Sequence, residues 1–239
     1  MKKPVFLTAR WEHLLMANYE VSPSVLSPLL PAHTELDTFN GKHFVSLVGF
    51  MFLNTKVLGV PVPFHRHFEE VNLRFYVRHK SGNEWRRGVV FVKEIVPKWA
   101  ISWVANTIYG EPYVCLPMNH RIQQTEQELS VNYGWQFQNM VFSMSANADS
   151  SAIEMPPHSE EEFITEHYWG YTRRDTTRTD EYAVEHPRWQ VYTIKSHQIQ
   201  CDFGQLYGEK FGFLTDQTPA SVLLAKGSAI VVRQGTQLQ

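Results

Sequence analysis

The residues best suited to chemistry are Glu70, Asn72 and Arg74, spaced two apart within Glu69–His79. Apolar residues occupy the alternate positions, a pattern typical of a β-strand with one apolar face, so the three polar side chains share the other face. An arginine can hold a carboxylate through two hydrogen bonds, and a glutamate can orient a hydroxyl group or a water molecule. We therefore predict a ligand anchor here. The alternative is a Glu70–Arg74 ion pair that only connects the sheet.

Two other stretches, Trp11-Glu12-His13 and Glu166-His167-Tyr168, combine aromatic bulk with polar groups. Pockets for small molecules have this mixed composition, so we predict that Trp11, His13 and Tyr168 line a substrate pocket. The alternative is that Trp11 and Tyr168 pack in the core and that His13 is a buried histidine with its hydrogen bonds satisfied.

A metal centre has weaker support. His65 and His67 would face one side of an extended segment, and Glu69 could add a carboxylate. The run follows a proline-rich loop and lacks further spaced ligands, so we predict neither a metal nor a cofactor. The sequence contains no nucleophile-elbow serine and no glycine-rich phosphate loop, which disfavours hydrolases and nucleotide-dependent enzymes.

The elements that must position these residues are mostly strands. His43–Leu53 is aromatic and β-branched with little charge, as expected of a strand covered on both faces. A turn at Ser81-Gly82-Asn83 joins Glu69–His79 to a strand over Gly88–Val96. Further strands are predicted near 113–118, 120–131, 133–144, 181–186, 190–201 and 228–233.

Short helices are expected where capping residues precede an apolar face. Ser22 can cap a helix that ends at Pro31, and Ser159 can cap one whose first turn is acidic. The predicted helices cover 22–31, 97–110, 159–167 and 202–206, and the predicted loops cover 54–67 and 146–151.

Three segments resemble a known family in their order and spacing: Leu29-Leu30-Pro31 with Glu35-Leu36-Asp37, Phe68–Val77, and Ala105–Leu116. They resemble the acetoacetate decarboxylase-like superfamily. Two more segments resemble its YqjF-like branch: Phe163–Thr172 and His186–Trp189. The resemblance implies one domain over residues 1–239, with an α+β, mostly antiparallel β fold closed as a barrel or cone around a central pocket, and a few short helices outside. It also places Glu70 where the decarboxylases carry a pocket glutamate.

In the decarboxylases, the positions that match Tyr113 and Val114 hold two lysines, the first of which forms a Schiff base with the keto acid. That chemistry requires an amine of lowered pKa, and a phenol cannot form an imine. The resemblance thus implies a pocket that has lost the Schiff-base lysine. Tyr113 could instead donate a hydrogen bond to a carbonyl group, and with Glu70 it could catalyse an acid-base reaction such as enolisation or hydration.

Two alternatives remain open. One is a non-catalytic ligand-binding or sensor protein, which Val114 and the 13% aromatic content favour. The other is a decarboxylase that uses a displaced lysine, for which Lys93 and Lys98 are nearest in sequence. Both lysines also suit a position that reaches solvent.

Composition and charge disfavour several classes of binding partner. The formal net charge of −2 and the scattered Lys and Arg residues disfavour nucleic acid. We find no signal-peptide core and no apolar stretch that could cross a bilayer, so we expect a cytoplasmic protein with no membrane partner. Cys115 and Cys201 lack metal-type spacing, and we expect no disulfide. The expected partner is a small-molecule ligand, and homo-oligomerisation is left open.

Overall fold

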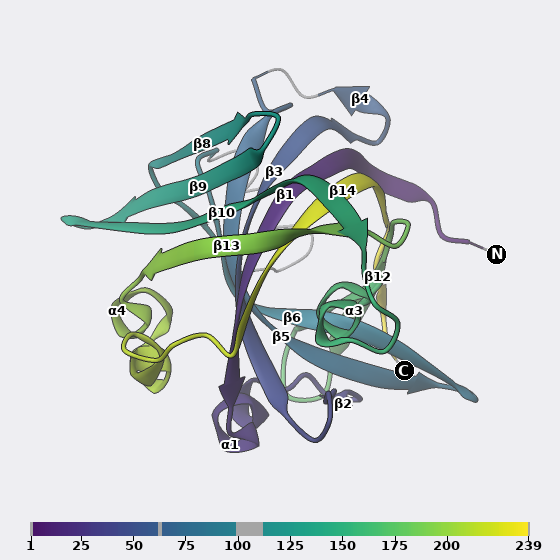
Figure 1. Cartoon of the computed structure of the whole chain (residues 1–239). Coiled ribbons are helices and arrows are strands. Elements are labelled where there is room, and N and C mark those ends of the chain that lie inside the picture. The colour runs from purple at the N-terminus through teal and green to yellow at the C-terminus, as the bar shows by residue number, and fades with distance from the viewer. Residues whose placement is uncertain (1, 62–63, 99–111, 239) are drawn as a thin grey trace.

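The computed structural model describes residues 2–61, 64–98 and 112–238. Its main feature is a closed ring of strands, because β14 pairs with both β1 and β12. The strands follow one another around the ring in the order β1-β3-β5-β6-β11-β12-β14. They cover Val5–Val21 (β1), His43–Val57 (β3), Phe68–Ser81 (β5), Glu84–Val96 (β6), Trp169–Arg173 (β11), Thr179–Glu185 (β12) and Ser221–Arg233 (β14). Figure 1 shows β1, β3 and β14 side by side, with β5 and β6 below them.

Beyond the ring, β14 also pairs with β13, and the sheet continues through β10, β9 and β8. These strands cover Gln190–Gln200 (β13), Met140–Glu154 (β10), Glu128–Phe137 (β9) and Met118–Gln124 (β8). Short strands complete the sheet: Glu35–Leu36 (β2), Val60–Pro61 (β4), Tyr113–Cys115 (β7) and Thr236–Gln237 (β15). The strand pairings are antiparallel except that β7 and β11 run parallel to β6. The expected mostly antiparallel fold with a closed ring is confirmed.

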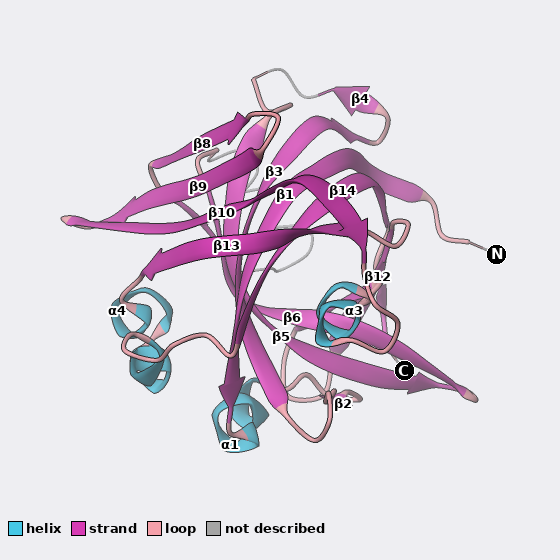
Figure 2. Cartoon of the chain, in the orientation of Figure 1, coloured by secondary structure: helices cyan, strands magenta, loops and turns pink. Residues whose placement is uncertain are grey.

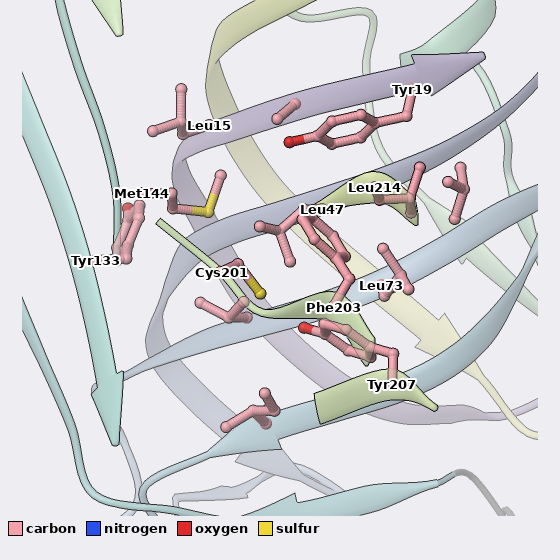
Figure 3. Close-up of a cluster of buried hydrophobic side chains, with 14 of the residues drawn as sticks. Leu15, Tyr19, Leu47, Leu73, Tyr133, Met144, Cys201, Phe203, Tyr207 and Leu214 are labelled. Atoms are coloured by element: carbon pink, nitrogen blue, oxygen red, sulfur yellow. The ribbon is translucent and has the colours of Figure 1, made fainter. Parts of the chain in front are cut away.

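Two apolar cores lie on opposite faces of the ring strands. The outer core fills the space between β3, β5 and the β9–β10 layer, and Figure 3 shows Leu47, Leu73, Tyr133 and Met144 packed there. The layers approach closely at Gly49, where an added Cβ would lie 2.7 Å from the Tyr133 ring. The inner core lies on the side of the strands that faces the ring interior. The alternation of β5 therefore places apolar residues outward and the predicted polar residues inward.

Strand β1 carries a bulge that exchanges its two faces. The register against β3 shifts between Glu12 and Leu15, and His13 has a φ of 56°. Trp11 packs against the inner core before the bulge, whereas Leu14 and Met16 belong to it afterwards. An inserted residue has this effect because side chains alternate between faces with a period of two. The sequence pattern predicts no strand here, since the bulge interrupts the alternation.

Short helices lie at the edges of the sheet (Figure 2). They cover Pro23–Leu26 (α1), Ser27–Leu29 (η1), Glu160–Thr165 (α3), Phe203–Tyr207 (α4) and Glu209–Leu214 (η2). Ser22 and Ser159 cap α1 and α3 as predicted. Phe163 and Ile164 of α3 contribute to the inner core. Among the described helices, none is long and apolar enough to cross a bilayer.

Several predicted boundaries are wrong. The loop 54–67 is partly strand, because β3 continues to Val57 and pairs with β4. The loop 146–151 lies inside β10, where Ala146 and Ala148 are buried and pair with β9. Small and polar residues suggested a loop, but they pair within the sheet. The strands predicted over 120–131 and 133–144 are β8, β9 and β10, with turns near 125 and 138. The helix predicted to begin at Pro97 falls mostly on 99–111, outside the described residues.

Candidate functional site

The interior of the ring contains a cavity of about 260 Å³. Its surface is mainly apolar and aromatic, and residues of β1, β3, β5, β6, β7, β11, β12 and β14 contribute to it. The lining residues with polar side-chain groups include Thr55, His65, Glu70, Asn72, Arg74, Glu94, Tyr113, His167 and Tyr182. Glu70, Asn72 and Arg74 therefore face one cavity, as the alternation of β5 requires.

Asn72 and Tyr113 both donate hydrogen bonds to Glu70. Asn72 Nδ2 donates to Glu70 Oε1 at 2.9 Å, and the Tyr113 hydroxyl donates to Glu70 Oε2 at 3.1 Å. Tyr113 comes within reach because β7 runs parallel to β6, next to Glu94. Glu70, Asn72 and Tyr113 thus form one hydrogen-bonded group on β5 and β7, the two strands that pair with β6 on either side of Glu94.

Arg74 is buried, with 8% of its surface exposed, and it lines the cavity. Its Nη2 lies 3.7 Å from the sulfur of Met16, and its guanidinium carbon lies 5.8 Å from the centre of the Tyr76 ring. Its Nε is buried without a hydrogen-bond partner within the described residues. The alternative Glu70–Arg74 ion pair is not among the salt bridges formed by the described part of the chain. A buried guanidinium therefore faces the cavity without a carboxylate partner among the described residues.

Glu94 is a cavity residue that the sequence analysis missed. It is 2% exposed and lies in register with Asn72 on β5 and Tyr113 on β7. Its signal is the charged pair Lys93-Glu94 within the otherwise apolar run Gly88–Val96. Burial, followed by the nearby charges of Glu70 and Glu94, raises the pKa of Tyr113 well above its usual value. The phenol consequently keeps its proton and acts as a hydrogen-bond donor.

His167 lies at the junction of the cavity with the inner core. Its ring centre is 4.8 Å from that of Tyr76 and 5.1 Å from that of Phe163. His167 Nε2 donates to Asp37 Oδ2 at 3.1 Å, and Arg87 Nε donates to the same oxygen at 2.6 Å. Burial lowers the pKa of His167 to about 4, although the Asp37 carboxylate opposes this effect. Because Nε2 carries the proton of the neutral ring, Nδ1 is an acceptor, and it has no partner among the described residues.

Of the other predicted pocket residues, Trp11 lies at the cavity, whereas His13 and Tyr168 lie elsewhere. Trp11 lines the cavity, and its ring meets those of Phe50 and Phe52 edge to face. His13 lies at the bulge of β1 and is not among the described lining residues; its carbonyl accepts a hydrogen bond from Tyr133.

Tyr168 lies on a second depression, beside His186, and its hydroxyl donates to Glu166. From the stretch Glu166-His167-Tyr168, the structure thus brings His167 to the cavity rather than Tyr168.

The described cavity lining contains no lysine. Lys93 donates a hydrogen bond to the Leu206 carbonyl, and its nitrogen lies 5.8 Å from the centre of the Tyr207 ring. Both contacts lie beside the outer core, on the face opposite Glu94. No group of three His, Cys, Asp or Glu residues that could hold a metal occurs in the described ranges, and both cysteines are free thiols there.

Comparisons with known proteins connect this geometry to a family. The DUF2071 family model, described as an uncharacterized conserved protein (COG2071), matches residues 8–229. The uncharacterized protein YqjF of Bacillus subtilis (strain 168) is 42% identical over 104 residues, which are 43% of this chain and 41% of that protein. The matched part therefore spans less than half of that relative.

Solved structures share the fold. An acetoacetate decarboxylase-like enzyme from Sphingomonas wittichii RW1 matches with a TM-score of 0.65 and 13% identity, over 99% of this chain and 94% of that one. Acetoacetate decarboxylase from Legionella pneumophila matches with a TM-score of 0.65 and 13% identity, over 100% and 90%. The enduracididine biosynthesis enzyme MppR, in complex with pyruvate, matches with a TM-score of 0.66 and 12% identity, over 100% and 92%.

At these identities the likeness to the solved structures establishes the architecture alone. The family model, in contrast, covers most of the sequence, including β5 and the segment that carries His167. This chain therefore belongs to the DUF2071 family and has an acetoacetate decarboxylase-like fold.

Proposed function

We propose that the chain binds a small carboxylate or keto compound in the ring cavity, with Arg74 as the anion anchor. The observation that carries this proposal is the buried guanidinium without a carboxylate partner among the described residues. Burying an unpaired charge costs several kcal/mol, so an anion at this position would offset a penalty that the fold already carries. The pyruvate bound to the structurally similar MppR supports the same ligand class.

The neighbouring groups suit acid-base chemistry. Tyr113 keeps its proton and can donate a hydrogen bond to a carbonyl oxygen, while Glu70 can accept a proton from carbon or water. Glu70 and Glu94 repel an anion, so the ligand carboxylate belongs at Arg74, with the reacting carbon closer to Glu70. Enolisation of a keto compound, or hydration, fits this arrangement.

A non-catalytic binding or sensor protein is the second candidate. The mainly apolar lining favours it, because aromatic walls bind well but supply few groups that transfer protons. A decarboxylase with a displaced lysine is the third candidate. Lys93 makes its contacts on the opposite face of the sheet, which argues against it. The cytoplasmic location and the state of self-association stay predictions.

Titration calorimetry with pyruvate and acetoacetate tests the anchor. Arg74→Met removes the charge and keeps much of the side-chain volume, so we expect binding to weaken at least about tenfold while the fold is retained. Arg78→Met is the matched control, because Arg78 lies on the same strand and pairs with Glu35 outside the cavity. Equal binding by both variants and the wild type would show that Arg74 is not the anchor.

Turnover separates the three candidates. An enolising enzyme exchanges the hydrogens beside the keto group for deuterium in D2O, and Tyr113→Phe and Glu70→Gln should slow this exchange. A binding protein is stabilised by the same compounds but exchanges nothing. Borohydride in the presence of a keto acid traps a lysine adduct only if the displaced-lysine mechanism operates.

A further inference from the structure

The cavity has an aromatic wall beside its polar groups, formed by Trp11, Phe50, Phe52 and Phe68. The Trp11 ring lies 5.2 Å from Phe50 and 5.7 Å from Phe52, and Phe52 stacks on Phe68 at 4.7 Å. Neighbouring strands hold these rings together, because Phe52 is in register with both Trp11 and Phe68. An added aromatic ring would find edge-to-face partners here.

The spacing of residues along β5 sets the length of a ligand that reaches both Arg74 and the aromatic wall. Phe50 is in register with Glu70, which precedes Arg74 by four residues. Four residues of strand span about 13 Å. A ligand that contacts both Arg74 and the aromatic wall must therefore extend along β5. A three-carbon acid held by Arg74 would leave the aromatic wall uncovered, whereas an acid with an aromatic ring at its far end would reach it.

The cavity volume permits such a ligand. A dry apolar cavity of about 150 Å³ is sufficient to bind benzene. The ring cavity, at about 260 Å³, has room for one aromatic ring and a short acid chain. Size and spacing therefore agree on a ligand with a ring at one end and an anion at the other.

Two hydrogen-bond acceptors near Arg74 lack partners among the described residues, which indicates that the ligand carries a hydrogen-bond donor. Asn72 Nδ2 donates to Glu70, so Asn72 Oδ1 is an acceptor, and it has no partner among the described residues. His167 Nδ1 is likewise an acceptor without a partner in the described part of the chain. Leaving a buried polar atom unsatisfied costs about 1–3 kcal/mol, so a ligand gains affinity by donating a hydrogen bond here. A carboxylate and a ketone cannot donate, whereas a hydroxyl group can.

We propose that the site is specific for aryl-substituted 2-hydroxy acids. The carboxylate binds Arg74, the adjacent hydroxyl donates to Asn72 or His167, and the ring packs on the aromatic wall. This assignment rests on the Arg74 anchor of the proposed function. It also fits enolisation, since the enol of an aryl keto acid presents the same three groups.

Calorimetric titration of the whole chain with four probes tests each group separately. The probes are 3-phenyllactate, 3-phenylpropionate, lactate and pyruvate. We expect 3-phenyllactate to bind at least about tenfold more tightly than 3-phenylpropionate, which lacks the hydroxyl, and at least about tenfold more tightly than lactate, which lacks the ring.

Two variants and one control variant show which residues cause these differences in affinity. Phe50→Leu should reduce the advantage of 3-phenyllactate over lactate, whereas Phe213→Leu, at an exposed position, should leave it unchanged. Asn72→Leu should reduce the advantage over 3-phenylpropionate. Should a variant fail to fold, the four-probe comparison on the wild type still decides.

The outcomes separate this inference from the proposed function. If lactate and pyruvate bind through Arg74 as tightly as the aromatic probes do, the aryl specificity is wrong while the anion anchor stands. If 3-phenylpropionate equals 3-phenyllactate, the hydroxyl assignment is wrong. If no probe binds, or if all bind equally well to Arg74→Met, the proposed anchor itself is wrong.

Discussion

The acid sensitivity of folding should depend on His167. Its side chain is 1% exposed, and burial lowers its pKa from 6.5 to about 4. The unfolded chain takes up the imidazole proton as the pH falls through about 6.5, but the folded protein takes it up only near pH 4. Between these values the unfolded state binds more protons, so stability decreases as the pH decreases.

The size of this effect follows from the two pKa values. Each pKa unit corresponds to 1.36 kcal/mol, so His167 should remove about 3 kcal/mol of unfolding free energy between about pH 7 and pH 4. His186 adds a similar dependence, because burial lowers its pKa to about 4 as well. A loss of about 3 kcal/mol is a large part of the unfolding free energy of a typical domain.

Urea unfolding of the wild type and His167→Gln at several pH values measures the effect. Glutamine can still donate to Asp37 but does not titrate, so the variant should lose about 3 kcal/mol less than the wild type on acidification. His197→Gln, at an exposed position on β13, is the control and should follow the wild type. If His167→Gln loses as much stability on acidification as the wild type, the inference that His167 is a buried neutral imidazole is wrong.

Substitutions at three further positions test the scaffold by urea unfolding. Asp37→Asn should cost about 2 kcal/mol of unfolding free energy at neutral pH, because hydrogen bonds from His167 and Arg87 outweigh burial and lower the Asp37 pKa to about 2. The difference in stability between variant and wild type should shrink below about pH 4, and a difference that stays constant with pH would contradict this cause. Gly227→Ala should cost more than about 2 kcal/mol, since φ is +80° and the added Cβ would lie 2.0 Å from the Trp11 carbonyl oxygen; a neutral result would contradict the close approach of β1 and β14. Ser159→Ala should cost about 1 kcal/mol through the lost cap of α3, and Ser159→Asp should preserve stability.

Local patterns predicted the parts of the site that lie on one strand. The alternation of Glu69–His79 placed Glu70, Asn72 and Arg74 on one face, and the structure has them facing one cavity. The caps at Ser22 and Ser159 were also predictable. These features depend on neighbours within a few residues, so a single sequence contains the necessary information.

Where the alternation is interrupted, the prediction failed. The bulge at His13 exchanges the faces of β1, and the sequence showed no strand there. Similarly, β6 shifts register between Phe91 and Lys93, so that Glu94 faces the cavity while Lys93 faces the outer core. A bulge depends on how two strands pair, which one strand's sequence does not specify.

The sequence by itself therefore determined the strand-rich fold class, the polar face of β5 and the presence of a tyrosine at position 113. Only the tertiary structure decided which residues these side chains contact. The Tyr113 hydroxyl reaches Glu70 across 43 residues of sequence, and His167 rather than Tyr168 enters the cavity because Asp37 holds its ring from 130 residues away. Closing a ring of strands brings such distant residues together, and the resulting burial and pairing set their pKa values and leave Arg74 without a carboxylate partner among the described residues.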